Sequence, residues 1–211
     1  MGKAVRGAIV LAGGSSTRMG RPKAFVPVAG VPLIVLVVRV AAQIADEVVV
    51  VTKPPQVQEI RELVRETAYV VADVQEEQSP LVGFASGAAA LKTEYTAFLG
   101  CDLPFLSPEI LDLLFEAAFD VDAVIPRWPD GKIEPMEAVY HRERAATAAL
   151  AALRGGRYAN SDMIAGLRKV RYVNVEGLRS LDSLLDSFLN VNTPKDLAVA
   201  EARAKSRGRP V

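Results

Sequence analysis

Short apolar segments alternate along the chain with longer segments whose apolar positions recur every three or four residues. The short segments are rich in β-branched residues and almost continuously apolar, which is typical of buried strands. They span residues 7–11, 47–52, 69–72, 95–101, 123–126, 136–140 and 169–175. Helical spacing is found at residues 31–45, 56–67, 81–91, 107–119 and 143–153. This alternation predicts an α/β fold, with a mostly parallel sheet covered by helices on both faces.

Helix-start residues sharpen three of these boundaries. Pro32 is placed for the first turn of the segment 31–45, and Ser107 is a candidate N-cap for the segment 107–119. Near the C-terminus, Thr193 and Asp196 have the spacing of a capping box, which predicts a last helix reaching about residue 205. The stretch 154–167 has no clear period. Since no linker interrupts the pattern, we expect one domain over residues 1–204 and a flexible tail over 205–211.

Composition and charge exclude several kinds of protein. The 211 residues include 25 basic and 25 acidic side chains, so general nucleic-acid binding is not expected. One cysteine, Cys101, and one histidine, His141, exclude a disulfide framework and metal sites built from several thiolates or imidazoles. The most apolar stretch, 31–45, is too short to span a bilayer. We therefore expect a cytoplasmic protein whose chemistry relies on carboxylates, cations, hydroxyls and backbone groups.

The segment LAGGSSTRMGRPK, residues 11–23, follows the first predicted strand. Its glycine spacing fits neither the P-loop nor the dinucleotide-binding fingerprint. The adjacent glycines Gly13 and Gly14 let successive backbone N–H groups point at one anion. Arg18 and Lys23 can neutralise a polyphosphate. The segment therefore predicts a phosphate-binding loop of a third kind.

Two aspartates follow predicted strands. Asp102, in FLGCDLPFLSP, comes directly after the strand 95–101, at the carboxyl edge where open α/β sheets bind ligands. It is the best candidate ligand for Mg²⁺, a cation that proteins hold with few carboxylates plus substrate phosphates. Asp73 ends the strand 69–72. Either residue could instead simply form a turn.

Five motifs together resemble the molybdenum cofactor guanylyltransferase family, within the nucleotidyltransferases. They are the loop at 11–23, the stretch VVADVQEEQSPLVGFASGA, CDLPFL, KIEPMEAVYH and FLNVNTPKDL. The last motif is nearly identical to its counterpart in the family. The three motifs before it depart from the family's patterns at four positions: Ser79, Leu103, Glu134 and Met136. The resemblance implies a Rossmann-like three-layer fold whose glycine-rich loop wraps the triphosphate of a nucleotide.

The resemblance also implies roles for individual residues. Arg18 and Lys23 would neutralise the triphosphate, and Asp102 would bind Mg²⁺ and act with them in catalysis. Asn190 and Asn192 would lie near the second substrate. The residues implied to contact the nucleotide are Leu11, Ala12, Gly13, Gly14, Lys23, Asp73 and Asp102.

The implied reaction joins GMP from GTP to the terminal phosphate of molybdenum-molybdopterin, with release of pyrophosphate. No nucleic acid or membrane would take part, and transient contact with proteins of cofactor biosynthesis or acceptor proteins would be expected. Two enzymatic alternatives keep the fold: a CTP-dependent molybdopterin cytidylyltransferase and a cobinamide-phosphate guanylyltransferase. The resemblance implies guanine rather than cytosine, because family members that prefer CTP tend to carry Leu-Ala-Ala-Gly where this chain has Leu11-Ala12-Gly13-Gly14. A nucleotide-sensing module without catalysis is the non-enzymatic alternative.

Overall fold

A seven-stranded sheet forms the centre of the structure, a computed structural model that describes residues 5–13, 20–73 and 79–208. The strand order is β5-β4-β1-β6-β8-β7-β9, and β8 runs antiparallel to both of its neighbours. All other pairs in the sheet are parallel. The strands are β1 (Arg6–Leu11), β4 (Glu47–Thr52), β5 (Tyr69–Ala72), β6 (Tyr95–Gly100), β7 (Ala123–Arg127), β8 (Glu137–His141) and β9 (Val170–Asn174).

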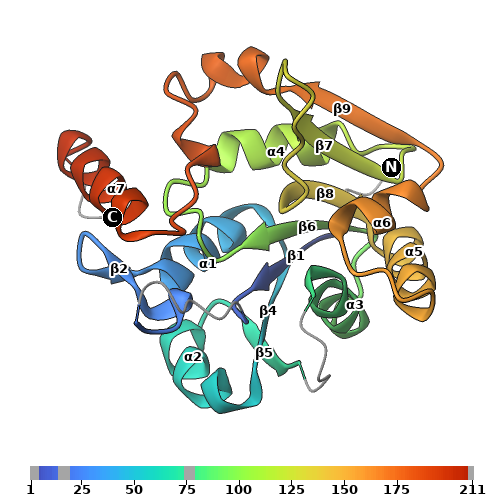
Figure 1. Cartoon of the computed structure of the whole chain (residues 1–211), viewed down its shortest axis with the longest axis horizontal. Helices are drawn as coiled ribbons and strands as arrows, with labels where there is room; N and C mark the ends of the chain where they lie inside the picture. The colour runs from blue at the N-terminus through green and yellow to red at the C-terminus, as the bar shows by residue number, and fades with distance from the viewer. Residues whose placement is uncertain (1–4, 14–19, 74–78, 209–211) are drawn as a thin grey trace.

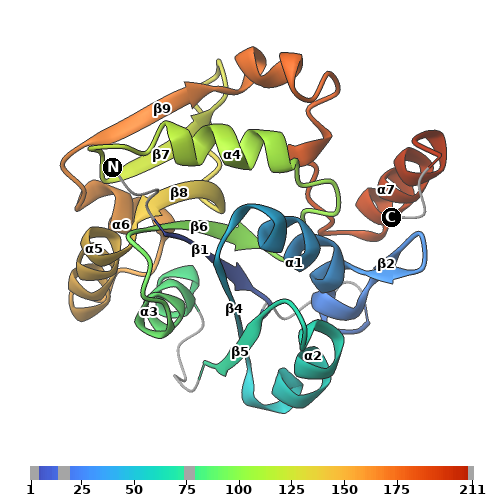
Figure 2. The same ribbon diagram turned by 180° about the vertical axis from the view of Figure 1, so that it is seen from behind.

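Helices cover both faces of this sheet, which confirms the predicted fold class. One face carries α1 (Leu33–Ile44), α2 (Val57–Val64) and α4 (Pro108–Glu116), and Figure 2 shows α1 and α4 in front of the strands. The other face carries α3 (Pro80–Ala90), α5 (Arg142–Arg154) and α6 (Asn160–Ala165), which lie together in Figure 1. Alternate strand residues enter the two cores: Val10 and Leu99 face α1 and α4, whereas Ile9 and Phe98 face α3 and α5.

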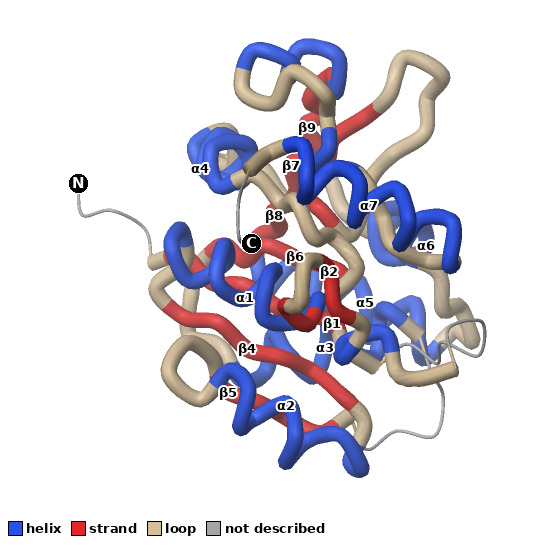
Figure 3. Tube along the Cα trace, turned by 90° about the vertical axis from the view of Figure 1, so that its left-hand side faces the viewer, coloured by secondary structure: helices blue, strands red, loops and turns tan. Residues whose placement is uncertain are grey.

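The last helix, α7 (Pro194–Ser206), packs beside a small hairpin rather than on the main sheet. The hairpin consists of β2 (Pro27–Val28) and β3 (Val31–Pro32), and Figures 1 and 3 show α7 next to it. Ala200 and Ala204 of α7 and Val28 belong to this third apolar cluster. The capping box predicted at Thr193 and Asp196 is present. It fixes the direction in which the chain enters α7.

Two local predictions were wrong. Pro32 does not lie in the first turn of α1: it pairs in β3, has extended backbone angles (φ −57°, ψ 139°) and precedes the first helical residue, Leu33. The stretch 154–167 is not irregular throughout, because it contains α6. Only Met163 and Ile164 of α6 are buried, and the Ala159 N–H is capped by Asp162 Oδ2 at 2.9 Å. Two buried apolar residues are too few to show a helical period, and the N-cap residue, Ala159, has no hydroxyl that would mark the start of a helix.

Within residues 5–13, 20–73 and 79–208, no helix combines the length and apolar character needed to cross a bilayer.

Candidate active site

A cavity of about 370 Å³ opens at the edge of the sheet where β1, β4, β5 and β6 end. Parallel strands bring their carboxyl ends to one edge, so residues that follow different strands gather there. The cavity is lined by the ends of β1, β4 and β6, by Asp73 beyond β5, by the first turns of α3 and by Met136 beside β8. Lys23 and Asp102, both predicted from the sequence, line it too.

Lys23, Asp102 and Asn192 meet at one end of the cavity. The Lys23 ammonium donates to Asp102 Oδ2 at 3.0 Å and to Asn192 Oδ1 at 2.6 Å. The ion pair is shielded, since the Lys23 and Asp102 side chains are only 18% and 17% exposed. An ammonium has three donors, so one N–H direction of Lys23 remains for a further acceptor.

Local structure fixes each member of this trio. Lys23 begins a short 3₁₀ turn, Lys23–Phe25, whose bonds include Val26 N–H to Lys23 C=O at 3.0 Å. The Asp102 C=O accepts from Val191 N–H at 2.9 Å, which ties the end of β6 to the segment preceding α7. The Asn192 N–H donates to Asp196 Oδ2 at 3.0 Å. The capping residue Asp196 of α7 therefore also positions a side chain that contacts Lys23.

Gly100 creates the space in which the Asp102 carboxylate lies. A Cβ on Gly100 would stand 2.3 Å from Asp102 Oδ1, closer than a real Cβ contact allows. The neighbouring Cys101 is buried, and burial raises the pKa of its thiol to about 12. Since a nucleophilic cysteine reacts as a thiolate, this protonated thiol agrees with a packing role for Cys101.

The other predicted residues divide into three groups. Leu11, Gly13 and Asp73 line the cavity. Ala12 is fully buried and its N–H donates to Val51 C=O at 2.9 Å, whereas Asn190 donates from its side chain to Phe188 C=O at 3.1 Å. The structure thus does not bring the Asn190 amide to Lys23 as it brings that of Asn192. Gly14 and Arg18 lie outside the described residues.

Sequence reasoning missed Lys53, a second cation in the cavity lining. Lys53 follows β4 directly, as Asp102 follows β6. The rule that ligands bind beyond the carboxyl ends of parallel strands could have found it. Sequence reasoning also missed the cap of α3: the Ser79 hydroxyl accepts from Val82 N–H at 3.2 Å. A Cβ on Gly83 would stand 2.6 Å from a methyl group of Leu11, so this glycine allows α3 to approach β1 closely.

The carboxylate of Asp102 can contribute one ligand to a hard divalent cation. Among the described residues, no three His, Cys, Asp or Glu side chains cluster in a way that would hold a metal ion by themselves. One carboxylate facing a cavity suits Mg²⁺, which keeps several waters and takes further oxygens from substrate phosphates. The residues present therefore fit a cation that binds together with a nucleotide.

The doubly covered sheet, the glycine-flanked cavity and the pairing of Lys23 with Asp102 define a nucleotide-binding protein of the nucleotidyltransferase class. Comparison with known families agrees: the MobA-like NTP transferase domain matches residues 8–170. The chain belongs to this family, and its relatives are enzymes.

Relatives of the whole chain carry more specific names. A probable molybdenum cofactor guanylyltransferase of Natronomonas pharaonis is 34% identical over 94% of this chain and 98% of its own. A molybdenum cofactor guanylyltransferase of Desulfosudis oleivorans is 33% identical over 94% and 95%. The solved structure of molybdopterin-guanine dinucleotide biosynthesis protein A from Archaeoglobus fulgidus superimposes with a TM-score of 0.80. It is 28% identical and is matched over 95% of this chain and 99% of its own.

Proposed function

We propose that this protein transfers GMP from GTP to the terminal phosphate of molybdenum-molybdopterin, giving the guanine dinucleotide cofactor and pyrophosphate. The observation that carries the proposal is the meeting of Lys23, Asp102 and Asn192 beside a cavity at the carboxyl edge. The names of relatives that match over nearly their whole length support guanine as the base and molybdopterin as the acceptor. Transient contact with proteins that supply or accept the cofactor, in the cytoplasm, belongs to the same proposal.

In this reaction a terminal phosphate oxygen of the acceptor attacks the α-phosphorus of GTP. The bond between the α-phosphorus and the oxygen bridging to the β-phosphate breaks, and both electrons of that bond leave with pyrophosphate. No bond to the protein forms, so the side chains act by positioning the reactants and by balancing charge.

Each side chain of the trio has a distinct task in this proposal. Lys23 donates to the phosphate oxygens through the N–H that Asp102 and Asn192 leave unused. Asp102 would hold Mg²⁺, which supplies charge neutralisation at the phosphates when it is bound. Asn192 holds the Lys23 ammonium through its amide oxygen, and we propose that it lies near the second substrate. Arg18, in the loop outside the described residues, is proposed to add a further positive charge.

Pyrophosphate release with each of the four ribonucleoside triphosphates, with and without molybdopterin, tests the proposal. We expect release only when GTP and molybdopterin are both present. Release with CTP in place of GTP would show a cytidylyltransferase. No release with any triphosphate, despite GTP binding, would identify a nucleotide-sensing module instead.

Replacing Asp102 by Asn tests the proposed metal ligand. The amide keeps the size of the carboxylate but lacks its charge, so we expect kcat to fall by roughly 100-fold or more. GTP-dependent binding of Mn²⁺, followed by electron paramagnetic resonance, should weaken in parallel. Asp120→Asn is a matched control, since Asp120 pairs with Lys169 at 2.9 Å on the exposed surface and lines no part of the cavity. Unchanged kcat and Mn²⁺ binding in the Asp102 variant would refute the assignment.

A further inference from the structure

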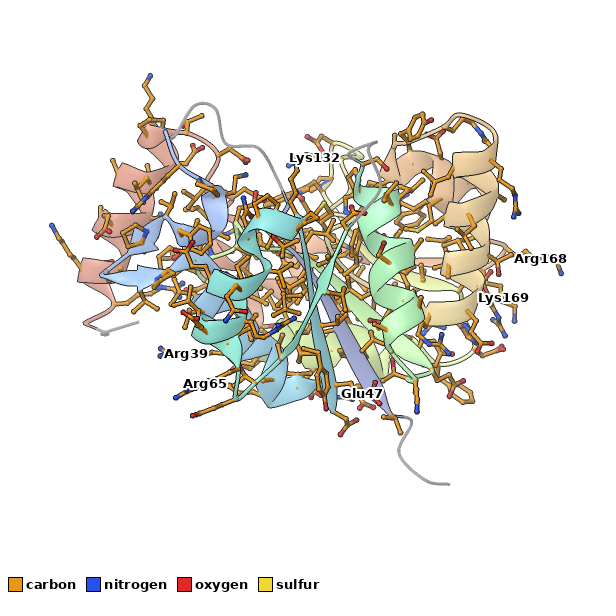
Figure 4. The ribbon with its side chains drawn as sticks, turned by 90° about the horizontal axis from the view of Figure 1, so that it is seen from below. Arg39, Glu47, Arg65, Lys132, Arg168 and Lys169 are labelled. Carbon is orange, nitrogen blue, oxygen red and sulfur yellow. The ribbon has the colours of Figure 1, made fainter. Side chains whose placement is uncertain are left out.

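The loop between β7 and β8 lies at the same edge of the sheet as the cavity, beyond Asp102. Because β8 is antiparallel to β6, its first residue, Glu137, pairs with Leu99 near the carboxyl end of β6. Figure 4 shows Lys132, in this loop, at the opposite edge of the molecule from Glu47, where β4 begins. The Gly100 N–H donates to Met136 C=O at 3.1 Å, so the loop borders the cavity directly.

Three side chains of this loop form a polar and aromatic cluster. The Glu134 Oε1 accepts from the Trp128 indole N–H and from the Lys132 ammonium, each at 2.8 Å. The Glu134 side chain is 14% exposed and Lys132 is 64% exposed. Among the described residues, Oε2 of Glu134 has no hydrogen-bond partner. A carboxylate offers about four acceptor sites, so this oriented group can still accept two hydrogen bonds.

The indole links this cluster to the segment that carries Asn192. The Trp128 ring meets Phe188 edge to face, with centroids 5.7 Å apart and an interplanar angle of 71°. Phe188 lies four residues before Asn192, which binds Lys23. Trp128 is only partly buried, so part of its ring remains available to a flat ligand.

We propose that Trp128, Lys132 and Glu134 bind the 2-amino-4-oxopyrimidine edge of the second substrate's pterin ring. That edge presents two adjacent N–H donors, one on the ring and one on the amino group, and a carboxylate accepts such a pair. The neighbouring keto oxygen is an acceptor for the unused donors of Lys132. The indole supplies a surface for stacking the bicyclic ring. The assignment rests on the proposed function, because it takes the acceptor to be a pterin.

Guanine carries the same edge, but the position of the cluster favours the acceptor. The cavity extends from Asp102 towards β4, β5 and α3, with Lys53 and Asp73 in its lining. The cluster stands on the other side of β6, since β8 and β7 follow β6 in the strand order. A nucleotide bound in the cavity with its phosphates at Lys23 and Asp102 therefore directs its base away from Glu134. For in-line attack the acceptor phosphate reaches the α-phosphorus opposite the leaving pyrophosphate, and the Glu134 side of β6, which the base does not occupy, is left for the acceptor's ring.

Trp128 is the only tryptophan of the chain, so its fluorescence reports directly on this loop. We would titrate the protein, without nucleotide, with 6-hydroxymethylpterin and with the 2,4-dioxo analogue 6-hydroxymethyllumazine, which lacks the amino group. In wild type we expect the pterin to quench the fluorescence at lower concentration than the lumazine. Glu134→Gln keeps an oxygen for Trp128 and Lys132 but turns the second acceptor into a donor. It should weaken pterin binding by roughly tenfold and leave lumazine binding unchanged.

Glu176→Gln is the charge-matched control, because Glu176 pairs with Arg179 at 2.6 Å and lies outside the loop; its pterin affinity should equal that of wild type. GTP affinity, measured by calorimetry, should be equal in wild type and the Glu134 variant. Equal pterin affinity in those two proteins, or no pterin quenching at all, would overturn the assignment. A loss of GTP affinity in the Glu134 variant would overturn it too, by assigning the carboxylate to guanine. Pyrophosphate release tests the proposed function separately, so either proposal can fail while the other stands.

Discussion

Glu137, the first residue of β8, carries a carboxyl group that is buried beneath the segment that leads to α7. The Glu137 Oε1 accepts from the Ser187 hydroxyl, and Ser187 Oγ accepts in turn from the Ser107 N–H at 3.0 Å. The other carboxyl oxygen, Glu137 Oε2, has no hydrogen-bond partner among the described residues. Burial raises the pKa of Glu137 from 4.5 to about 8, partly offset by the Ser187 hydrogen bond and reinforced by Glu134 and Asp182. The carboxyl is therefore mostly protonated at neutral pH.

The raised pKa makes the free energy of unfolding depend on pH. Between pH 4.5 and about 8 the folded protein holds a proton that the unfolded chain has released, so stability falls as pH rises through this window. Each pH unit inside the window costs about 1.4 kcal/mol, so the contribution lost by pH 8 is about 5 kcal/mol. Above pH 8 both states are ionised and the loss levels off.

Glu137→Gln removes this titration while keeping an acceptor for Ser187. We expect the stability of wild type relative to the variant to decrease by about 3 kcal/mol between pH 5.5 and 7.5. Urea unfolding at several pH values, followed by circular dichroism, measures the difference. Parallel curves for the two proteins across this range would refute a raised pKa at Glu137.

Asp122→Asn provides a matched control with a buried carboxylate of the opposite kind. Burial alone would raise the pKa of Asp122, but Arg144 at 2.7 Å and the N–H groups of Arg168 and Lys169 lower it below its usual value. A lowered pKa gives stability that is lost only as pH falls through the acid range. The Asp122 variant should therefore be destabilised by the same amount at pH 5.5 and 7.5.

Two further substitutions test the cavity. Gly100→Ala would place a Cβ 2.3 Å from Asp102 Oδ1, so the carboxylate must move. In steady-state assays kcat should fall about 10- to 100-fold, with little change in the free energy of unfolding in urea. Unchanged kcat would show that the position of the carboxylate is not critical. Lys53→Met should raise the KM for the nucleotide roughly tenfold and leave the KM for the second substrate unchanged, because Lys53 lines the cavity that we propose binds the nucleotide. An effect on the second substrate alone would contradict this proposed orientation.

Most strands were predictable because they are short and almost continuously apolar; β9, with the sequence VRYVN, is an exception. The predicted strand 69–72 has the bounds of β5, and 95–101 overruns β6 by one residue. The hairpin of β2 and β3 was not predictable, since each strand has only two residues and no periodicity can form. The burial of Glu137 was equally hidden. A charged residue in a strand next to apolar neighbours suggests a solvent-facing position, yet the segment around Ser187 covers it.

The site was predictable only as separate parts. Lys23 and Asp102 each belong to a motif. Both follow strands of one mostly parallel sheet, and such sheets bind ligands beyond the carboxyl ends of their strands. The contact between Lys23 and Asn192 joins residues 169 positions apart and depends on how α7 and the preceding segment pack. No local pattern encodes such packing. The capping box at Thr193 predicted where the helix starts, but not that Asn192, just before it, would contact Lys23.

Lys23 is held by both Asp102 and Asn192, and this arrangement explains why the Asn192 amide lies beside the ion pair of Lys23 with Asp102. With no substrate bound, Lys23 and Asp102 neutralise each other, so their pair presents little net charge to an incoming triphosphate. If Asp102 turned to a metal cation, a lysine held by that carboxylate alone would lose its partner. The Asn192 amide oxygen is a neutral acceptor at 2.6 Å that does not compete for the cation. The ammonium can therefore stay beside the cavity with its charge released for phosphate, which ties the function of Asn192 to Lys23 rather than to direct substrate contact alone.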